Sequence, residues 1–208
     1  LEFGNQYIRF YKDKGQITDS GSAYEISSPY LTAELFEIKF AQSADVMYLV
    51  HKNHAVRKLS RTGHTSWTLA EVSFTDGPYL SENTTATTLT PASASTGTGV
   101  NITASAITGI NGGVGWLATD VGRIISMNSG LATITARTNS TVVVATITKA
   151  FSNANAITDW KLGAFSGTTG HPSCVSFFEQ RLVFAGTSAE PQTLYFSKSG
   201  DYENMTTG

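Results

Sequence analysis

The sequence predicts an all-β protein in which a small antiparallel β domain is inserted into a second β-rich domain. The first observation is compositional. Hydrophobic residues make up 40% of the 208 residues, enough for a core, whereas charged residues make up 14% and serine and threonine together about a quarter. Because threonine is β-branched and suits a half-exposed strand, this composition favours sheets and argues against a helical bundle.

The second observation is a change of composition along the chain. Residues 84–159 carry few charges, whereas the two flanks are charged and aromatic. This pattern is typical of a domain inserted into a loop, since exposed loops tolerate insertions best. We therefore expect a first domain at residues 1–80, an inserted Thr/Ala/Gly-rich β domain at 81–165, and a return to the first domain at 166–208.

Short apolar runs separated by turn residues predict hairpins in both flanks. In the first flank we expect strands at residues 7–11, 45–51, 55–60 and 66–72, with one helical turn at 32–37. In the second flank we expect strands at residues 173–178, 181–186 and 193–197.

The middle region also consists of short apolar runs separated by turn residues, but its runs are less apolar. We expect strands at residues 100–107, 122–127, 131–136 and 141–148, and a closing segment at 158–162. Asn128-Ser129-Gly130 is a turn sequence between two of these strands. The region therefore predicts a small antiparallel sheet or barrel.

An internal repeat links the two flanks. Residues 59–63 and 196–200 share the pattern apolar, Ser, basic, hydroxyl, Gly, which aligns Ser60 with Ser197 and Gly63 with Gly200. An apolar strand precedes each copy by about a dozen residues. Matching strand, loop, strand and turn units are typical of successive propeller blades. The flanks are therefore predicted to be part of a β-propeller with blade-like antiparallel hairpins.

Three of the four histidines fall within one stretch, as His51, His54 and His64. A His-x-x-His pair can supply two zinc ligands, and His64 could be a third. If His51 ends a strand and His54 lies in the hairpin loop, however, the imidazoles need not converge, and no carboxylate lies between His51 and His64. We interpret the three as surface or hairpin histidines and expect no metal ligands.

Other patterns that resemble catalytic sites have simpler explanations. Cys174 follows His171, but a cysteine inside an apolar strand is typically a small core residue. Residues 113–118 match a relaxed dinucleotide fingerprint, yet they lie in Thr/Gly-rich β sequence and are expected to be a loop. We therefore expect a protein that is not an enzyme, with no catalytic residue and no cofactor.

The charge pattern limits the partners of the protein. The net charge is −2, the pI is near 6.1 and no basic run occurs, which argues against a dedicated nucleic-acid binder. A single cysteine allows no intrachain disulfide and no thiolate zinc cluster. The longest uncharged stretch is too polar for a membrane span. The first residues begin inside strand-like sequence, so we expect a fragment of a longer protein.

Parts of both flanks resemble a known family. The stretches are FAQSADVMYLVH (residues 40–51), RKLSR (57–61), PSCVSFFEQRLVFAG (172–186) and PQTLYFSKSGDYEN (191–204). They resemble the tail nozzle, or tail tubular protein B, of short-tailed, podovirus-like bacteriophages and prophages. The middle region resembles only relatives that carry an insertion, and the chain is much shorter than members of the family.

The resemblance implies a structural virion protein. Such a subunit belongs to a homo-oligomeric ring, commonly a hexamer, at the distal end of the tail, where it contacts adaptor and fibre proteins. It forms part of the channel through which genomic DNA is ejected, without sequence-specific binding, and it is assembled in the bacterial cytoplasm. A mildly acidic, Ser/Thr-rich surface suits such a channel because it attracts phosphate weakly.

Two alternatives remain open from the sequence. One is a receptor- or glycan-binding module of a phage tail, because the nearly uncharged insert contains aromatic residues. The aromatic residues available for a sugar platform are Tyr7, Tyr11, Tyr30, Trp67, Trp116 and Trp160. The other is a sialidase-like hydrolase, because residues 60–67 approach the hairpin-turn motif of such propellers, although no acid/base pair is apparent.

Overall fold

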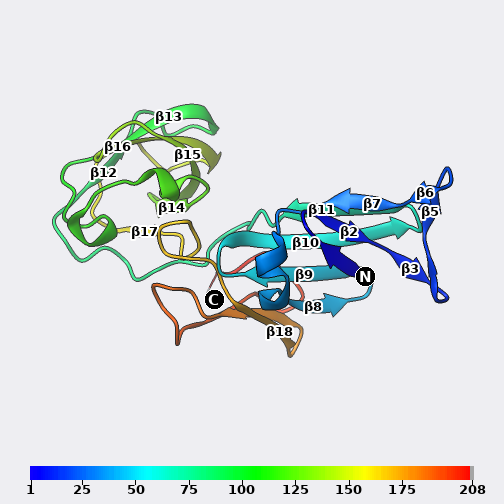
Figure 1. Cartoon of the computed structure of the whole chain (residues 1–208). Helices are drawn as coiled ribbons and strands as arrows, with labels where there is room; N and C mark the ends of the chain where they lie inside the picture. Colours follow the sequence, from blue (N-terminus) through cyan, green and yellow to red (C-terminus); the bar gives the residue numbers. More distant parts are fainter. Residues whose placement is uncertain (207–208) are drawn as a thin grey trace. The chain divides into compact units, whose positions relative to one another are not determined.

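The protein is an all-β structure, as the composition predicts. The computed structural model describes residues 1–206, and strands account for 49% of the structure and helices for 6%. The chain folds as two compact units (Figure 1). Unit 1 comprises residues 1–74 and 171–203, and unit 2 comprises residues 75–170 and 204–206. No helix within residues 1–206 is both long enough and apolar enough to cross a membrane.

Unit 1 contains a four-stranded antiparallel sheet whose strands follow one another along the chain. They are β8 (Lys39–Ser43), β9 (Val46–His51), β10 (His54–Gly63) and β11 (Ser66–Glu71), in the order β11-β10-β9-β8. Leu49 in β9 and Leu59 in β10 are buried and form a small core with Ile8 and Phe10. The indole of Trp67 stacks on Phe10 with ring centroids 4.3 Å apart, which covers one side of this core.

A second meander in unit 1 has three strands. They are β18 (Cys174–Phe178), β19 (Arg181–Ala185) and β20 (Leu194–Phe196). β18 lies beside β8 and β9, and Phe177 meets Tyr48 edge to face at a centroid distance of 6.2 Å. Lys58 and Tyr48 both bind the carboxylate of Glu203, which ties the end of the unit to the four-stranded sheet.

The remaining elements of unit 1 are short. They are β1 (Glu2–Gly4), β2 (Tyr7–Arg9), β3 (Tyr11–Lys12), β4 (Gly15–Gln16), β5 (Thr18–Asp19), β6 (Ser22–Ala23), β7 (Glu25–Ser27) and the 3-10 helix η1 (Thr32–Glu37). β1, β2 and β7 form a three-stranded sheet, and β3–β4 and β5–β6 are separate hairpins.

Unit 2 is a curled six-stranded sheet, a half-barrel. Its strands are β12 (Leu89–Pro91), β13 (Gly97–Ala104), β14 (Ile124–Met127), β15 (Gly130–Arg137), β16 (Val142–Lys149) and β17 (Trp160–Leu162), in the order β12-β13-β16-β15-β14-β17. Leu89 exchanges two backbone hydrogen bonds with Ile157, just before β17, so the two edges of the sheet meet at one point. Irregular register between β13 and β16 and between β15 and β16 adds to the curl.

The hollow side of this sheet holds the core of unit 2. Fifteen buried residues fill it, and the largest are Trp116 and Trp160. Two 3-10 turns, η2 (Asn111–Gly113) and η3 (Ala118–Asp120), lie in the connection between β13 and β14. Both insert tryptophans are therefore core residues, and neither is available as an exposed sugar platform.

Most expected strands are confirmed to within one residue, including those at 45–51, 66–72 and 181–186. The strand expected at 100–107 is misplaced, because β13 begins at Gly97 and ends at Ala104. The strand β8 is not expected from the sequence. Its exposed residues include Phe40, so it lacks the period-two apolar pattern that identifies a half-buried strand.

A buried ion pair stands beside the core of unit 2. Arg123 donates from Nη1 to Asp120 Oδ1 at 3.0 Å and from Nε to the carbonyl of Gly163 at 2.7 Å. The other carboxylate oxygen of Asp120 accepts hydrogen bonds from Leu117 N–H at 2.8 Å and from the Asn111 side chain at 2.7 Å. Both charged side chains are almost completely buried, so each depends on the other for compensation.

We expect Asp120→Asn to destabilise unit 2 by about 3 kcal/mol, because it leaves the Arg123 guanidinium buried without its counter-charge. Urea denaturation followed by tryptophan fluorescence measures this loss. The matched control is Asp159→Asn, because Asp159 is exposed and its replacement is expected to cost less than about 0.5 kcal/mol. Equal losses in the two variants would contradict the role of the buried pair.

Candidate metal centre

Two histidines meet at the turn between β9 and β10. His51 is the last residue of β9, His54 is the first of β10, and the two are paired across the strands. Because directly opposed residues in an antiparallel pair project to the same face, the imidazoles lie together, with ring centroids 5.2 Å apart. The prediction that these rings need not converge is therefore wrong for this pair. The prediction fails because it assumes that His54 lies in the loop, whereas the turn consists of Lys52 and Asn53 alone.

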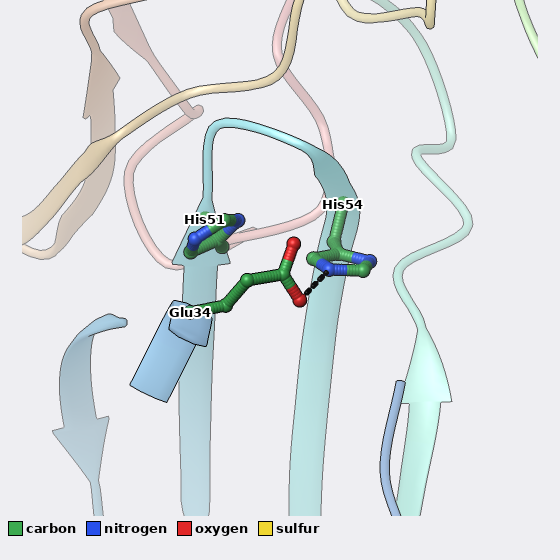
Figure 2. A group of neighbouring side chains, drawn as sticks. All are labelled: Glu34, His51 and His54. Atoms are coloured by element: carbon green, nitrogen blue, oxygen red, sulfur yellow. Dashed lines mark hydrogen bonds and ion pairs between the residues drawn. The ribbon is translucent and has the colours of Figure 1, made fainter. Parts of the chain in front are cut away.

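A carboxylate from η1 completes the cluster. Glu34 Oε2 lies 2.8 Å from His54 Nε2 (Figure 2). The same oxygen accepts the backbone N–H of Leu31 at 2.9 Å, and Oε1 accepts the side-chain amide of Asn53 at 3.3 Å. These hydrogen bonds lower the pKa of Glu34 to about 2, and the Leu31 N–H has the largest effect. Glu34 is therefore an anion at neutral pH.

The three side chains bring their donor atoms close together. One ligand atom each from Glu34, His51 and His54 lies within 4.8 Å of the others. Figure 2 shows the carboxylate between the two rings, with the histidines on adjacent strands and the glutamate coming from η1. Two imidazoles and a carboxylate are a donor set that suits zinc and other divalent transition metals.

His51 is the most enclosed member of the cluster, with 1% of its surface exposed. Its Nδ1 accepts the backbone N–H of Asn53 at 3.2 Å, so the ring proton of the neutral form is on Nε2. Nε2 lies 3.5 Å from a Glu37 carboxylate oxygen but forms no hydrogen bond. Burial lowers the pKa of His51, which favours the neutral imidazole.

The other histidines lie elsewhere. His64 is exposed, and its ring nitrogens face Lys12 Nζ at 3.5 Å and Arg61 Nη2 at 3.3 Å. His171 is half-buried, and its Nδ1 has no hydrogen-bond partner. Cys174 is exposed at the start of β18, so the prediction of a core cysteine is wrong. The alternation along this strand turns Val175 inward and Cys174 outward.

The residues of the sequence repeat occupy different backbone environments. Ser60 lies inside β10, paired with Val46 and Thr68, and Gly63 ends that strand. Ser197 and Gly200 lie after β20, and Gly200 has a positive φ of 75°. Ser197 is fully buried, where its Oγ accepts the N–H of Leu182 at 2.8 Å and donates to the Lys198 carbonyl at 2.9 Å.

Unit 2 contains an open cavity of about 440 Å³ lined by both polar and apolar residues. Its lining residues include Asn83, Thr85, Gly109, Arg123 and Trp160. Asn83 is held by hydrogen bonds from its amide to the carbonyls of Thr85 and Thr87 at 3.0 and 3.1 Å. The cavity is therefore a second place at which a small polar ligand could be bound.

Comparison of the sequence with protein-family models and with curated proteins finds no match to either.

The two serines of the repeat give a stability prediction. We expect Ser197→Ala to lower the free energy of unfolding by about 2 kcal/mol, because it leaves the N–H of Leu182 buried without an acceptor. Ser60→Ala is the matched control and is expected to cost less than about 0.5 kcal/mol, since Ser60 is half-buried and its strand keeps its backbone bonds. Urea denaturation distinguishes the two, and equal costs would mean that the two serines have equivalent roles.

Glu34 gives a pH-dependent prediction. Its pKa is about 2 in the folded protein against an ordinary value of 4.5, so the ionised carboxylate stabilises the fold above pH 4.5. This stabilisation is lost as the pH falls from 4.5 towards 2. In chelator-treated protein, the difference in unfolding free energy between wild type and Glu34→Gln should therefore be constant near neutral pH and shrink in that window. A difference that is unchanged down to about pH 3 would contradict the lowered pKa of Glu34 in the folded protein.

Proposed function

We propose that the chain is part of a structural subunit of a short phage tail, a nozzle protein that lines the route of DNA ejection. The observation that carries the proposal is the location of the exposed aromatic side chains. Within residues 1–206, every large aromatic side chain classed as exposed lies in unit 1, and Phe36, Phe40 and Phe178 are 95%, 60% and 58% exposed. Contiguous exposed apolar area typically marks a contact surface, and Phe40 and Phe178 lie on the neighbouring strands β8 and β18.

The two meanders of unit 1 support a propeller-like interpretation. β8–β11 form a four-stranded sheet of consecutive strands, as in a propeller blade, and β18–β20 form the start of a similar one. Both meanders coincide with the stretches that resemble tail nozzle proteins, residues 40–61 and 172–204. In this proposal the chain holds two blades of a larger propeller, with unit 2 inserted between them.

The proposed surroundings are a homo-oligomeric ring with adaptor and fibre proteins at its rims. A ring closes through heterologous contacts, in which one face of a subunit meets a different face of the next. Exposed phenylalanines on β8, β18 and η1 provide apolar area for such contacts. The net charge of −2 leaves little attraction for DNA phosphates, which suits a channel that releases DNA.

The cavity of unit 2 favours a second candidate function, carbohydrate binding by a tail adhesin. Its lining residues include Asn83, Thr85 and Thr168, whose amide and hydroxyl groups are of the kind that hydrogen-bond to sugar hydroxyls. The buried positions of Trp116 and Trp160 remove the stacking platform on which the sequence argument rested. The cavity is therefore the feature of unit 2 that supports this candidate.

Immunogold electron microscopy of tailed particles from the source culture tests the proposal, using antibodies raised against this chain. We expect label on the tail tube or tip and the chain's peptides in mass spectra of purified particles. Intact tailed particles whose spectra lack those peptides would refute the virion assignment. Label on projecting fibres, with glycan binding that Asn83→Ala abolishes, would favour the adhesin instead.

A further inference from the structure

We propose that Glu34, His51 and His54 bind one divalent transition-metal ion of the zinc class, at the turn between β9 and β10. The site is independent of the function proposed above. It is built from one carboxylate and two imidazoles whose donor atoms already lie within 4.8 Å of one another. Because two of the three donors are nitrogens, the site suits Zn²⁺, Co²⁺ or Ni²⁺ better than Mg²⁺ or Ca²⁺, which prefer oxygen.

The distances require only a small adjustment. Ligands at about 2.0–2.1 Å from a tetrahedral zinc ion lie about 3.3 Å from one another. The Glu34–His54 pair is at 2.8 Å, so this pair would open slightly, and the His51 donor atom, which lies within 4.8 Å of the other two, would move closer. The strand pairing fixes the two histidines on one face, and the Leu31 N–H holds the carboxylate in place. These contacts prepare the site before any ion arrives.

The metal takes the place of a hydrogen bond between Glu34 and His54. In the metal-free protein, the N–H of His54 Nε2 points to Glu34 Oε2. Coordination through Nε2 requires the proton to leave that nitrogen, either to Nδ1 of the same ring or to solvent. The nitrogen lone pair and the carboxylate oxygen then both face the ion, and water fills the remaining coordination position.

Metal binding also changes the turn itself. The backbone N–H of Asn53 is bonded to Nδ1 of His51. If the ion binds Nδ1, it displaces this N–H. If the ion binds Nε2, the ring proton moves to Nδ1, which can no longer accept the N–H. Either route frees the amide of Asn53, so a shift of this amide is a signature of the proposed site.

Glu37 is a neighbour of the site but is committed to another partner. Its carboxylate binds Lys52 Nζ at 2.7 Å and lies on the Nε2 side of His51 at 3.5 Å. The positive charge of Lys52 offsets the negative charge of Glu37, so this pair adds little net attraction for a cation. We assign Glu37 the role of a neighbouring charge and not of a ligand.

The test uses the whole chain after treatment with chelator. Calorimetric titration with Zn²⁺ and visible spectroscopy with Co²⁺ should each show one ion bound per chain. We expect His54→Gln and Glu34→Gln to weaken binding by at least about tenfold. Both side chains are partly exposed, and circular dichroism verifies that the variants are folded. The matched control is His64→Gln, which removes an exposed histidine outside the cluster and should leave the affinity unchanged.

Nuclear magnetic resonance supplies a readout that does not depend on substitution. One equivalent of Zn²⁺ should shift the backbone amide of Asn53, while the amides of unit 2 stay in place. The proposal is overturned if wild-type protein binds no ion. It is also overturned if His64→Gln loses as much affinity as His54→Gln, or if both cluster variants keep wild-type affinity. None of these outcomes bears on the tail assignment, which electron microscopy tests separately.

Discussion

Unit 1 depends on the register of the β9–β10 pairing, because this hairpin contributes Leu49 and Leu59 to its core and both histidines to its polar cluster. Leu49 and Leu59 point into the small apolar core, and His51 faces His54 at the end of the same two strands. Side chains alternate between the faces of a sheet, so a slip by one residue would move these leucines out of the core. It would also separate the histidines. The packing of the sheet and the chemistry at its turn are thus two results of one hydrogen-bonding pattern.

Unit 2 follows a different principle. Its core is large and continuous, and the apolar side chains of six strands converge on Trp116 and Trp160. The long connection from β13 to β14 forms no regular strand, although Gly122 and Arg123 at its end exchange backbone hydrogen bonds with Ile134 of β15. The Asp120–Arg123 network holds the rest of this connection against the sheet. Asp120 binds the Leu117 N–H and Arg123 binds the Gly163 carbonyl, so two charged side chains satisfy backbone groups that the sheet leaves unpaired.

The sequence predicts the strands well and the cluster poorly, for physical reasons that particular residues illustrate. The strands at β9, β11 and β19 have apolar periods that follow from local geometry. Glu34 is 20 residues from His54, and only the fold of η1 brings the two together. The sequence motif His-x-x-His was visible, but its meaning depended on a two-residue turn that sequence alone places to within a few residues. The two copies of the repeat around Ser60 and Ser197 have similar sequences, but they lie in different backbone environments.

The element that brings the glutamate to the histidines is itself weakly anchored. None of the residues of η1 is buried, and Phe36 on the same helix is 95% exposed. Polar contacts therefore hold η1: Glu34 binds His54 and Asn53, Glu37 binds Lys52, and the N–H of Thr32 binds Asn5 Oδ1 at 3.2 Å. Hydrogen bonds to half-exposed groups contribute little each, so a coordinated ion would add more to the position of η1 than any one of them. Because η1 also carries Phe36, the state of the cluster would govern how firmly this exposed side chain is held in place.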